Sequence, residues 1–193
     1  MKYLIVVLVF VMGAITIGEA RWCINCTANS GVDCDGESVE CENEGDFCQK
    51  ATSIRSVYGQ LRYQVIKGCK SVSGSCNKFV NANTNEFWLL LYSECCYDDN
   101  CNTGEIYMPK QNTTENGLNC PSSLVIGSDQ CGTGNETVPC KGDQTVCFMF
   151  AADGTGPDKA NYCMKGCISE GVCELPTDAS TTSTTSRSCK PAQ

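Results

Sequence analysis

Three cysteines stand within the stretch SECCYDDNCN, Ser93 to Asn102, where Cys95 and Cys96 are adjacent and Cys101 follows five residues later. Thiols at this spacing could ligate a metal, carry out redox chemistry or close disulfide bonds. Asp98 and Asp99 lie between them and could act as a calcium or acid–base pair. The composition of the whole chain helps to separate these possibilities.

The chain contains no histidine, which excludes Ser-His-Asp catalysis, Cys-His catalysis and histidine-ligated zinc. Calcium needs six or more oxygens from a coordinated loop, whereas Asp98 and Asp99 sit in a loop of four residues between Cys96 and Cys101. This favours a solvated turn. We therefore predict no catalytic residue, no metal site and no cofactor, and expect a protein that is not an enzyme.

The N-terminus indicates where the cysteines are oxidised. Lys2 precedes an apolar run from Tyr3 to Ile17, and Gly18-Glu19-Ala20 ends it with small residues at the two positions that a signal peptidase recognises. This pattern predicts a secretory signal peptide over residues 1–20 and a secreted, extracellular product. The run is too short for a comfortable bilayer span, which needs about 20 apolar residues.

The 18 cysteines all follow this segment, and this density is typical of a disulfide scaffold in an oxidising compartment. A net charge of −8 without a basic stripe argues against nucleic acid or an anionic membrane as a partner. The end of the chain, STTSTTSRSCKPAQ, is polar, so we expect no lipid anchor.

The cysteines divide the chain into two groups. Ten lie between Cys23 and Cys101, and eight between Cys120 and Cys189. The stretch between them is rich in asparagine and poor in apolar residues, which predicts a first domain over 21–102, a linker over 103–117 and a second domain over 118–193. Each domain is small enough to need its cross-links for stability.

The two groups also form an internal repeat. CENEGDFC at Cys41 to Cys48 matches CKGDQTVC at Cys140 to Cys147, and YQVIKGCKSVSGSC at Tyr63 to Cys76 reads again as NYCMKGCISEGVC at Asn161 to Cys173. Two motifs repeated in the same order indicate a duplicated module.

The first group predicts β-hairpins. The segment Ser53 to Ile66 is rich in β-branched and aromatic residues, with Gly59 as its turn, and Asn77 to Cys95 predicts a second hairpin with NANTN as its turn. The stretch between Cys26 and Cys34 predicts a third, smaller hairpin. The fold class expected is therefore all-β and disulfide-rich.

The spacing of the first ten cysteines, which closes with CC-x4-CN at CCYDDNCN, resembles a complete Ly6/uPAR three-finger domain. The resemblance implies five disulfides: Cys23–Cys48, Cys26–Cys34, Cys41–Cys69, Cys76–Cys95 and Cys96–Cys101. Adjacent cysteines rarely bond each other, because the ring strains the peptide between them, so Cys95 and Cys96 are independently expected to have different partners.

The second group departs from this pattern. Ser123 stands where the family's second cysteine would fall, and no CC-x4-CN closes the domain. We therefore expect two tandem three-finger domains, the second incomplete. Family analogy implies the disulfides Cys120–Cys147, Cys140–Cys167 and Cys173–Cys189, which would leave Cys131 to pair with Cys163.

A complete domain followed by a truncated one resembles the two-domain branch that contains gamma-type phospholipase A2 inhibitors and the sodefrin precursor-like factors, which are courtship pheromones. The resemblance implies a non-catalytic protein that presents finger loops to a protein partner. We expect an extracellular chemosignal that binds a sensory receptor, with an inhibitor of a secreted phospholipase A2 as the alternative.

Aromatic and arginine side chains are the usual interface anchors, and they mark the predicted finger ends. The expected partner-binding residues are Arg55, Tyr58, Gln60, Arg62, Phe87 and Trp88. Trp88 could equally fill the small core. Sequons predict N-glycosylation at Asn112 and Asn135, whereas Asn25 is discounted because its sequon contains the bridged Cys26.

Overall fold

The computed structural model describes residues 20–71, 76–154, 161–173 and 184–193. The predicted signal peptide, apart from Ala20, lies outside the described residues. Every helix or strand assigned in the described part is a β-strand, and all pairings are antiparallel, as the all-β prediction requires. These residues contain no helix long and apolar enough to cross a membrane.

The first half of the chain forms three hairpins side by side. We call them the first finger (β1–β2), the second finger (β3–β4) and the third finger (β5–β6). Their strands are β1 (Trp22–Ala28), β2 (Glu37–Glu40), β3 (Phe47–Val57), β4 (Gln60–Lys70), β5 (Phe79–Asn83) and β6 (Phe87–Cys96). Strand β6 pairs with β3 from Cys48↔Cys96 to Val57↔Phe87, so the second and third fingers form one continuous sheet along their whole length.

The structure refines two of the predicted turns. In the first finger Trp22–Asn25 pair with Glu37–Glu40, while Cys26–Ala28 continue β1 along β4. The stretch from Cys26 to Cys34 is therefore not a hairpin of its own. In the third finger the turn lies beyond the predicted NANTN centre, because Asn81 and Asn83 continue strand β5. Both asparagines are buried against the second half of the chain, which holds these turn-forming residues in an extended conformation.

The second half repeats the plan of the first. Its strands are β7 (Glu115–Pro121), β8 (Ser123–Ile126), β9 (Thr137–Lys141), β10 (Gln144–Asp153), β11 (Asn161–Ser169) and β12 (Thr184–Pro191). Strand β10 pairs with β11 and β12, just as β3 pairs with β4 and β6. Strands β7 and β9 form a separate two-stranded sheet.

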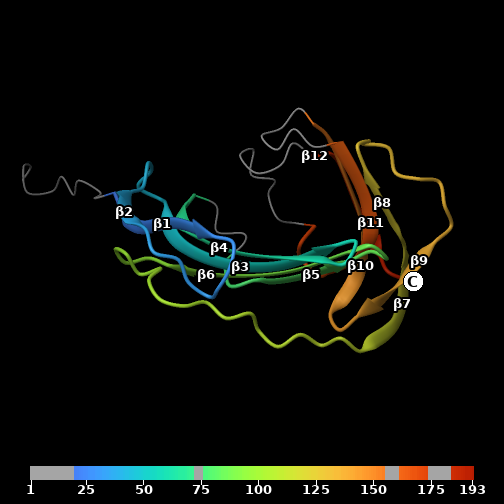
Figure 1. Cartoon of the computed structure of the whole chain (residues 1–193), viewed down its shortest axis with the longest axis horizontal. Coiled ribbons are helices and arrows are strands. Elements are labelled where there is room, and N and C mark those ends of the chain that lie inside the picture. The colour runs from blue at the N-terminus through green and yellow to red at the C-terminus, as the bar shows by residue number, and fades with distance from the viewer. Residues whose placement is uncertain (1–19, 72–75, 155–160, 174–183) are drawn as a thin grey trace, which may run out of the picture.

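The two halves meet where the third finger reaches strand β11. Strand β5 pairs with β11 through Asn83↔Cys167 and Ala82↔Ile168. Val80 and Ala82 from β5 share a buried apolar cluster with Phe148 and Ile168 from the second half. Figure 1 shows β10, β11 and β12 standing at one end of the long sheet of the first half and steeply inclined to it. The two halves are therefore joined by strand pairing and by buried apolar side chains, as within the core of one domain.

The segment between the halves is partly anchored. Residues 103–114 contain no strand and run alongside the first sheet (Figure 1). Ile106 is buried next to Cys34 and Val65, and its amide donates to the carbonyl of Val32 over 2.8 Å. Strand β7 begins at Glu115. The limits predicted for the two domains stay predictions.

Candidate protein-binding surface

The turn of the second finger confirms the predicted position of Gly59. Tyr58 and Gly59 form a two-residue loop between β3 and β4, with φ of 48° and 79°. Positive φ at both central residues is the signature of a type I′ hairpin turn, whose twist matches that of the strands. Tyr58 is 62% exposed, and its amide donates to the carbonyl of Glu86 over 2.8 Å. The second finger therefore ends in a rigid loop that carries an exposed aromatic ring.

Arg55 and Arg62 lie directly opposite each other on β3 and β4, on the same face of the sheet as Gln60. All three side chains are exposed. Like charges directly opposite each other destabilise a sheet, and neither guanidinium has an ion-pair partner among the described residues. Together with Ser53 and Gln64 the two arginines line a shallow cavity of about 250 Å³.

Phe87 and Trp88 are split between the two faces, because successive side chains of a strand point to opposite sides. Phe87 lies opposite Val57 and shares the face of the arginines, where it is half-buried. Trp88 lies opposite Ser56 on the other face and is 37% exposed. The six residues predicted to bind a partner thus lie near one end of the sheet. Tyr58 lies in the turn of the second finger, and the other five are divided between the two faces of the sheet.

The face of Trp88 also carries exposed apolar side chains that are not among the predicted partner-binding residues. Leu61 and Tyr63 are 54% and 46% exposed. Ser56 is the cross-strand neighbour of both Leu61 and Trp88, and Ile54 is the neighbour of Tyr63. We call Ile54, Leu61, Tyr63 and Trp88 the apolar patch. The alternation of Leu61, Tyr63 and Val65 in the sequence is enough to place them on one face of a strand. It does not indicate that Val65 is buried while Leu61 and Tyr63 stay exposed.

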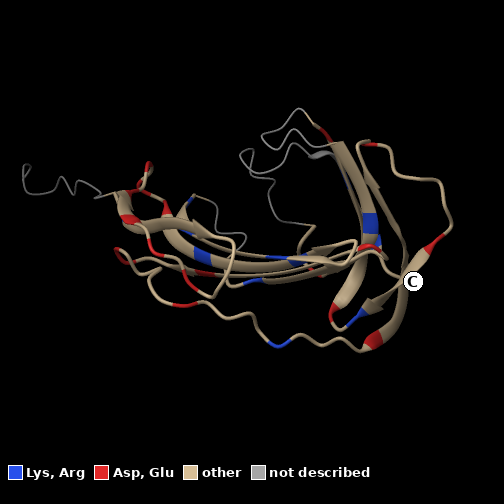
Figure 2. Cartoon of the chain, viewed as in Figure 1, with Lys and Arg blue, Asp and Glu red and all other residues tan. Residues whose placement is uncertain are grey.

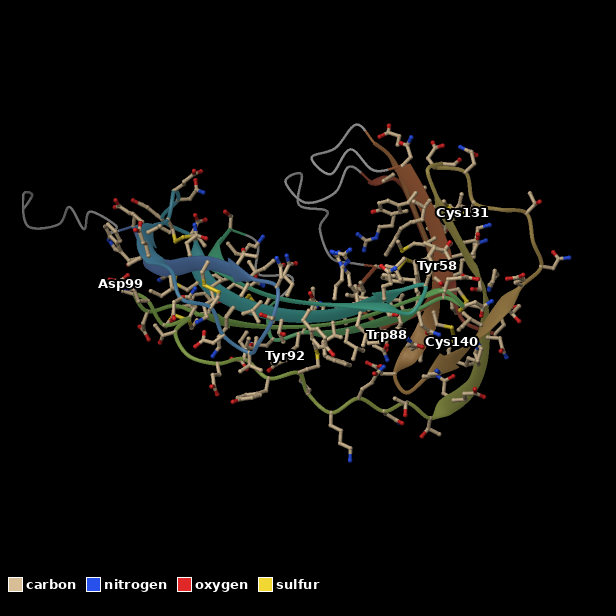
Figure 3. The ribbon with its side chains drawn as sticks, in the orientation of Figure 1. Tyr58, Trp88, Tyr92, Asp99, Cys131 and Cys140 are labelled. Atoms are coloured by element: carbon tan, nitrogen blue, oxygen red, sulfur yellow. A yellow bond between two sulfur atoms is a disulfide. The ribbon has the colours of Figure 1, made fainter. Side chains whose placement is uncertain are left out.

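The end of the third finger is occupied by the second half of the chain. The amide of Asn85 donates to the Ser122 hydroxyl over 2.9 Å, and the Gln144 side chain donates to the Asn81 amide oxygen over 2.9 Å. Figure 3 shows Tyr58 and Trp88 at the end of the first sheet that meets the second half, and Asp99 at the opposite end. Of the two fingertips predicted to be presented, only that of the second finger is thus open to a partner.

The opposite end of the first sheet is a base held by disulfides, and a second group of disulfides lies in the second half. The structure joins nine cysteine pairs: Cys23–Cys48, Cys26–Cys34, Cys41–Cys69, Cys76–Cys95, Cys96–Cys101, Cys120–Cys147, Cys131–Cys163, Cys140–Cys167 and Cys173–Cys189. Two buried clusters of three sulfurs, one in each half, have the proximity of a metal site. Every sulfur in them is already bonded to another sulfur, so none is available as a thiolate ligand.

Polar contacts complete this base. The buried Asn102 donates its amide to the carbonyls of Ile24 and Gln49, over 2.9 and 3.1 Å, and accepts from the amide of Ile24. Asp99 accepts a hydrogen bond from the amide of Trp22 over 2.9 Å. Asn102 and Asp99 therefore hold strand β1 against the base.

Lys67 on β4 forms an ion pair with Asp33, which lies in the loop of the first finger. Lys67 is only 2% exposed, and its ammonium group contacts the Asp33 carboxylate and donates to the carbonyl of Cys34 over 3.2 Å. The hydrogen bond from Lys67 lowers the pKa of Asp33 below its ordinary value. The pair holds the loop of the first finger against β4.

The predicted glycosylation sites, Asn112 and Asn135, are both exposed. The side-chain oxygen of Asn112 accepts from the amide of Thr114 over 3.0 Å, which forms a local turn. Asn25, whose sequon contains the bridged Cys26, is also exposed. Whether glycans are attached to Asn112 and Asn135 stays a prediction.

No family model matches the chain. It is similar to phospholipase A2 inhibitor LNF1 of Lachesis muta muta, with 30% identity over 176 residues that cover 88% of this chain and 84% of that protein. It is 25% identical to a gamma-type phospholipase A2 inhibitor of Gloydius brevicaudus siniticus over 166 residues, which are 79% of this chain and 78% of that protein. Protein RoBo-1 of Rattus norvegicus is 24% identical over 179 residues, 91% of this chain and 72% of that protein. Among solved structures, that of mouse TEX101 aligns with 86% of this chain and 95% of that chain, at 18% identity and a TM-score of 0.38.

Proposed function

Because the chain belongs to the Ly6/uPAR-type three-finger family that includes the gamma-type phospholipase A2 inhibitors, we propose that it is a secreted, non-catalytic protein that binds and inhibits a phospholipase A2. The observation that carries this proposal is the 30% identity to an inhibitor over 84% of that protein's length. This identity reverses the order of the two hypotheses drawn from the sequence, since it favours the inhibitor over the chemosignal.

The apolar patch supports this function. A secreted phospholipase A2 works at a lipid surface and must expose an apolar, lipid-facing area. Leu61, Tyr63 and Trp88 offer a complementary apolar area, and aromatic anchors of this kind dominate binding energy in protein interfaces. The patch lies on paired strands, so its side chains lose little conformational freedom on binding. An inhibitor that covers the lipid-facing area keeps the enzyme from its substrate.

The test is binding of the purified chain to an immobilised secreted phospholipase A2, together with inhibition of that enzyme on phospholipid micelles. We expect binding at micromolar concentration or tighter. Trp88→Ser and Tyr63→Ser should each weaken it about tenfold or more, because each removes a central aromatic anchor. The matched control is Ile126→Ser, which removes an exposed apolar side chain from strand β8.

Two outcomes would overturn the proposal. If the unaltered chain binds no phospholipase at micromolar concentration, the inhibitor function is wrong. If it binds and the Ile126 variant loses as much affinity as the Trp88 variant, the surface is wrong. The chemosignal hypothesis stays a prediction, and production of the transcript in a skin or courtship gland would favour it.

A further inference from the structure

The two halves of the chain place equivalent residues on equivalent strands. In the first half Lys50 on β3 lies between Lys67 on β4 and Glu94 on β6. In the second half Met149 on β10 lies between Lys165 on β11 and Ser188 on β12. The same face of the sheet can therefore be compared residue by residue.

In the first half the part of this face near the disulfide base is covered, and its charges are paired. Lys50 contacts the Glu94 carboxylate at 3.2 Å and donates to the carbonyl of Glu105 over 3.1 Å. Lys67 is buried beneath the first-finger loop, with Asp33 as its counter-ion. Cys96, opposite Cys48 on β3, is closed over by its bond to Cys101.

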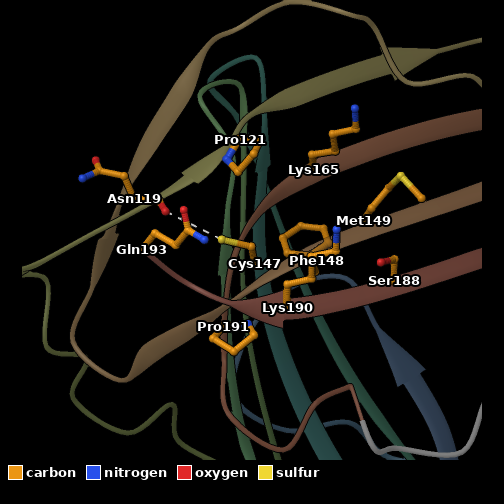
Figure 4. A pocket seen from close by; sticks show the side chains of 10 residues that line it. All are labelled: Asn119, Pro121, Cys147, Phe148, Met149, Lys165, Ser188, Lys190, Pro191 and Gln193. Carbon is orange, nitrogen blue, oxygen red and sulfur yellow. Dashed lines mark hydrogen bonds between the residues drawn. The ribbon is translucent and has the colours of Figure 1, made fainter.

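In the second half the cover differs, because the loop after β8 is tied by Cys131–Cys163 instead and no cysteine stands on β12 opposite Cys147. Ser123 replaces the cysteine that anchors the first-finger loop, and the position equivalent to Cys96 is Lys190, which lies opposite Cys147. The surface that is filled in the first half is here an open cavity of about 310 Å³. Figure 4 shows Cys147 and Met149 along it, with Pro121 and Pro191 at its sides.

Two ammonium groups border this apolar cavity. Lys165 and Lys190 come from the strands on either side of β10, and both line the cavity. Lys165 has one resolved polar contact, to the carbonyl of Gly132 at 3.5 Å. The two ion pairs found among the described residues both belong to the first half, so neither lysine has a carboxylate partner there. An apolar floor with unpaired cations is suited to an anion that has an apolar body.

We propose that this cavity binds a small amphipathic carboxylate, such as a medium-chain fatty acid. The aliphatic chain lies on Met149 and the prolines, and the carboxylate lies between Lys165 and Lys190. The cavity volume is at the lower end of the range for small-ligand sites. A polyanion is disfavoured because the chain carries a net charge of −8 and repels it at long range, as Figure 2 illustrates by acidic positions spread over both halves.

The test is titration of the full chain with decanoate below its micelle concentration, followed by calorimetry and by the NMR signal of the Met149 methyl group. We expect saturable binding that shifts this signal. Lys165→Gln and Lys190→Gln should each weaken binding about tenfold, because each removes one charge-assisted hydrogen bond. Ser188→Glu restores the acidic residue of the first half and should abolish binding.

Two controls separate the site from general effects. Lys110→Gln removes an exposed lysine from the segment between the halves and should leave the affinity unchanged. Decanol has the same chain without the charge and should bind at least about tenfold more weakly if the ammonium groups act as proposed. Non-saturable decanoate binding, or equal affinity of the Lys110 and Lys190 variants, would overturn the inference. None of these outcomes depends on whether the chain binds a phospholipase.

Discussion

Lys67 and Lys165 occupy equivalent positions but have different surroundings. Both precede the Gly-Cys pair of the repeated motif, and both lie beside the central strand of their half. Lys67 is buried against Asp33, whereas Lys165 lines an open cavity. A buried ammonium group needs a counter-ion, because removal from water disfavours its charged form. The local sequence is therefore compatible with either role, and the covering loop selects one.

The Asp33–Lys67 pair makes stability depend on pH. The pKa of Asp33 is lowered in the folded chain, chiefly by the hydrogen bond from Lys67, so the unfolded chain takes up a proton first as the pH falls. The contribution of the pair is complete above the ordinary value of 3.8 and is lost as the pH falls below it, towards the lowered pKa.

Thermal midpoints measured from about pH 6 to about pH 2 would check this. We expect Asp33→Ala to lower stability by roughly 1–3 kcal/mol near neutral pH, because Lys67 is left without its counter-ion. The difference from the unaltered chain should shrink at the acid end. A difference that is independent of pH would contradict the assignment.

At the scale of elements, the junction between β5 and β11 decides how the halves are placed. It depends on Gly166, where a built Cβ atom would lie 2.0 Å from the carbonyl oxygen of Asn83. The equivalent glycine of the first half, Gly68, would bring its Cβ atom only to 3.4 Å from the side chain of Asn25. The repeated glycine thus permits a close strand contact between the halves at one position and an ordinary contact at the other.

We expect Gly166→Ala to destabilise the chain by about 1–3 kcal/mol or more, since the atom it would strike belongs to the backbone and cannot move aside cheaply. The matched control is Gly134→Ala, because a Cβ atom there meets nothing within 4 Å. Differential scanning calorimetry gives both values. An alanine at 166 that is as well tolerated as one at 134 would show that the strands do not approach so closely.

At the scale of the whole molecule, each half is held by its own disulfides, and the shared apolar cluster joins the two halves. Each half has its own buried group of bridged cysteines, and the cluster of Val80, Ala82, Phe148 and Ile168 lies between them. The apolar patch, formed by the second finger near its turn and by Trp88 of the third finger, stays uncovered and lies on paired strands. Rigidity at the base and exposure at the finger suit a binding protein.

Peptide mapping of the unreduced protein should recover the nine cross-linked pairs that the structure contains and no free thiol. The bond between Cys131 and Cys163 has no counterpart in the first half, so it is the most informative one. Its removal by Cys131→Ala with Cys163→Ala should cost about 2–4 kcal/mol, because the unfolded chain regains the entropy of a closed loop. A free thiol at either position in the natural chain would contradict the pairing.

The sequence by itself determined the fold class, the hairpins of the second and third fingers, and the turn at Gly59. These features follow from local β-propensity and turn chemistry, which neighbouring residues encode. The cysteine spacing, through its family resemblance, also indicated where the cross-linked bases lie. The sequence could not place Leu61 and Tyr63 at a surface, because alternation assigns residues to a face without showing what covers that face.

Only the tertiary structure decided which parts stay open. It buried the end of the third finger in the joint with β11 and left the cavity beside Lys165 open. Each of these outcomes depends on contacts between residues far apart in the chain. Burial is a property of such contacts, so two copies of one motif can be identical in local sequence and differ in what they expose.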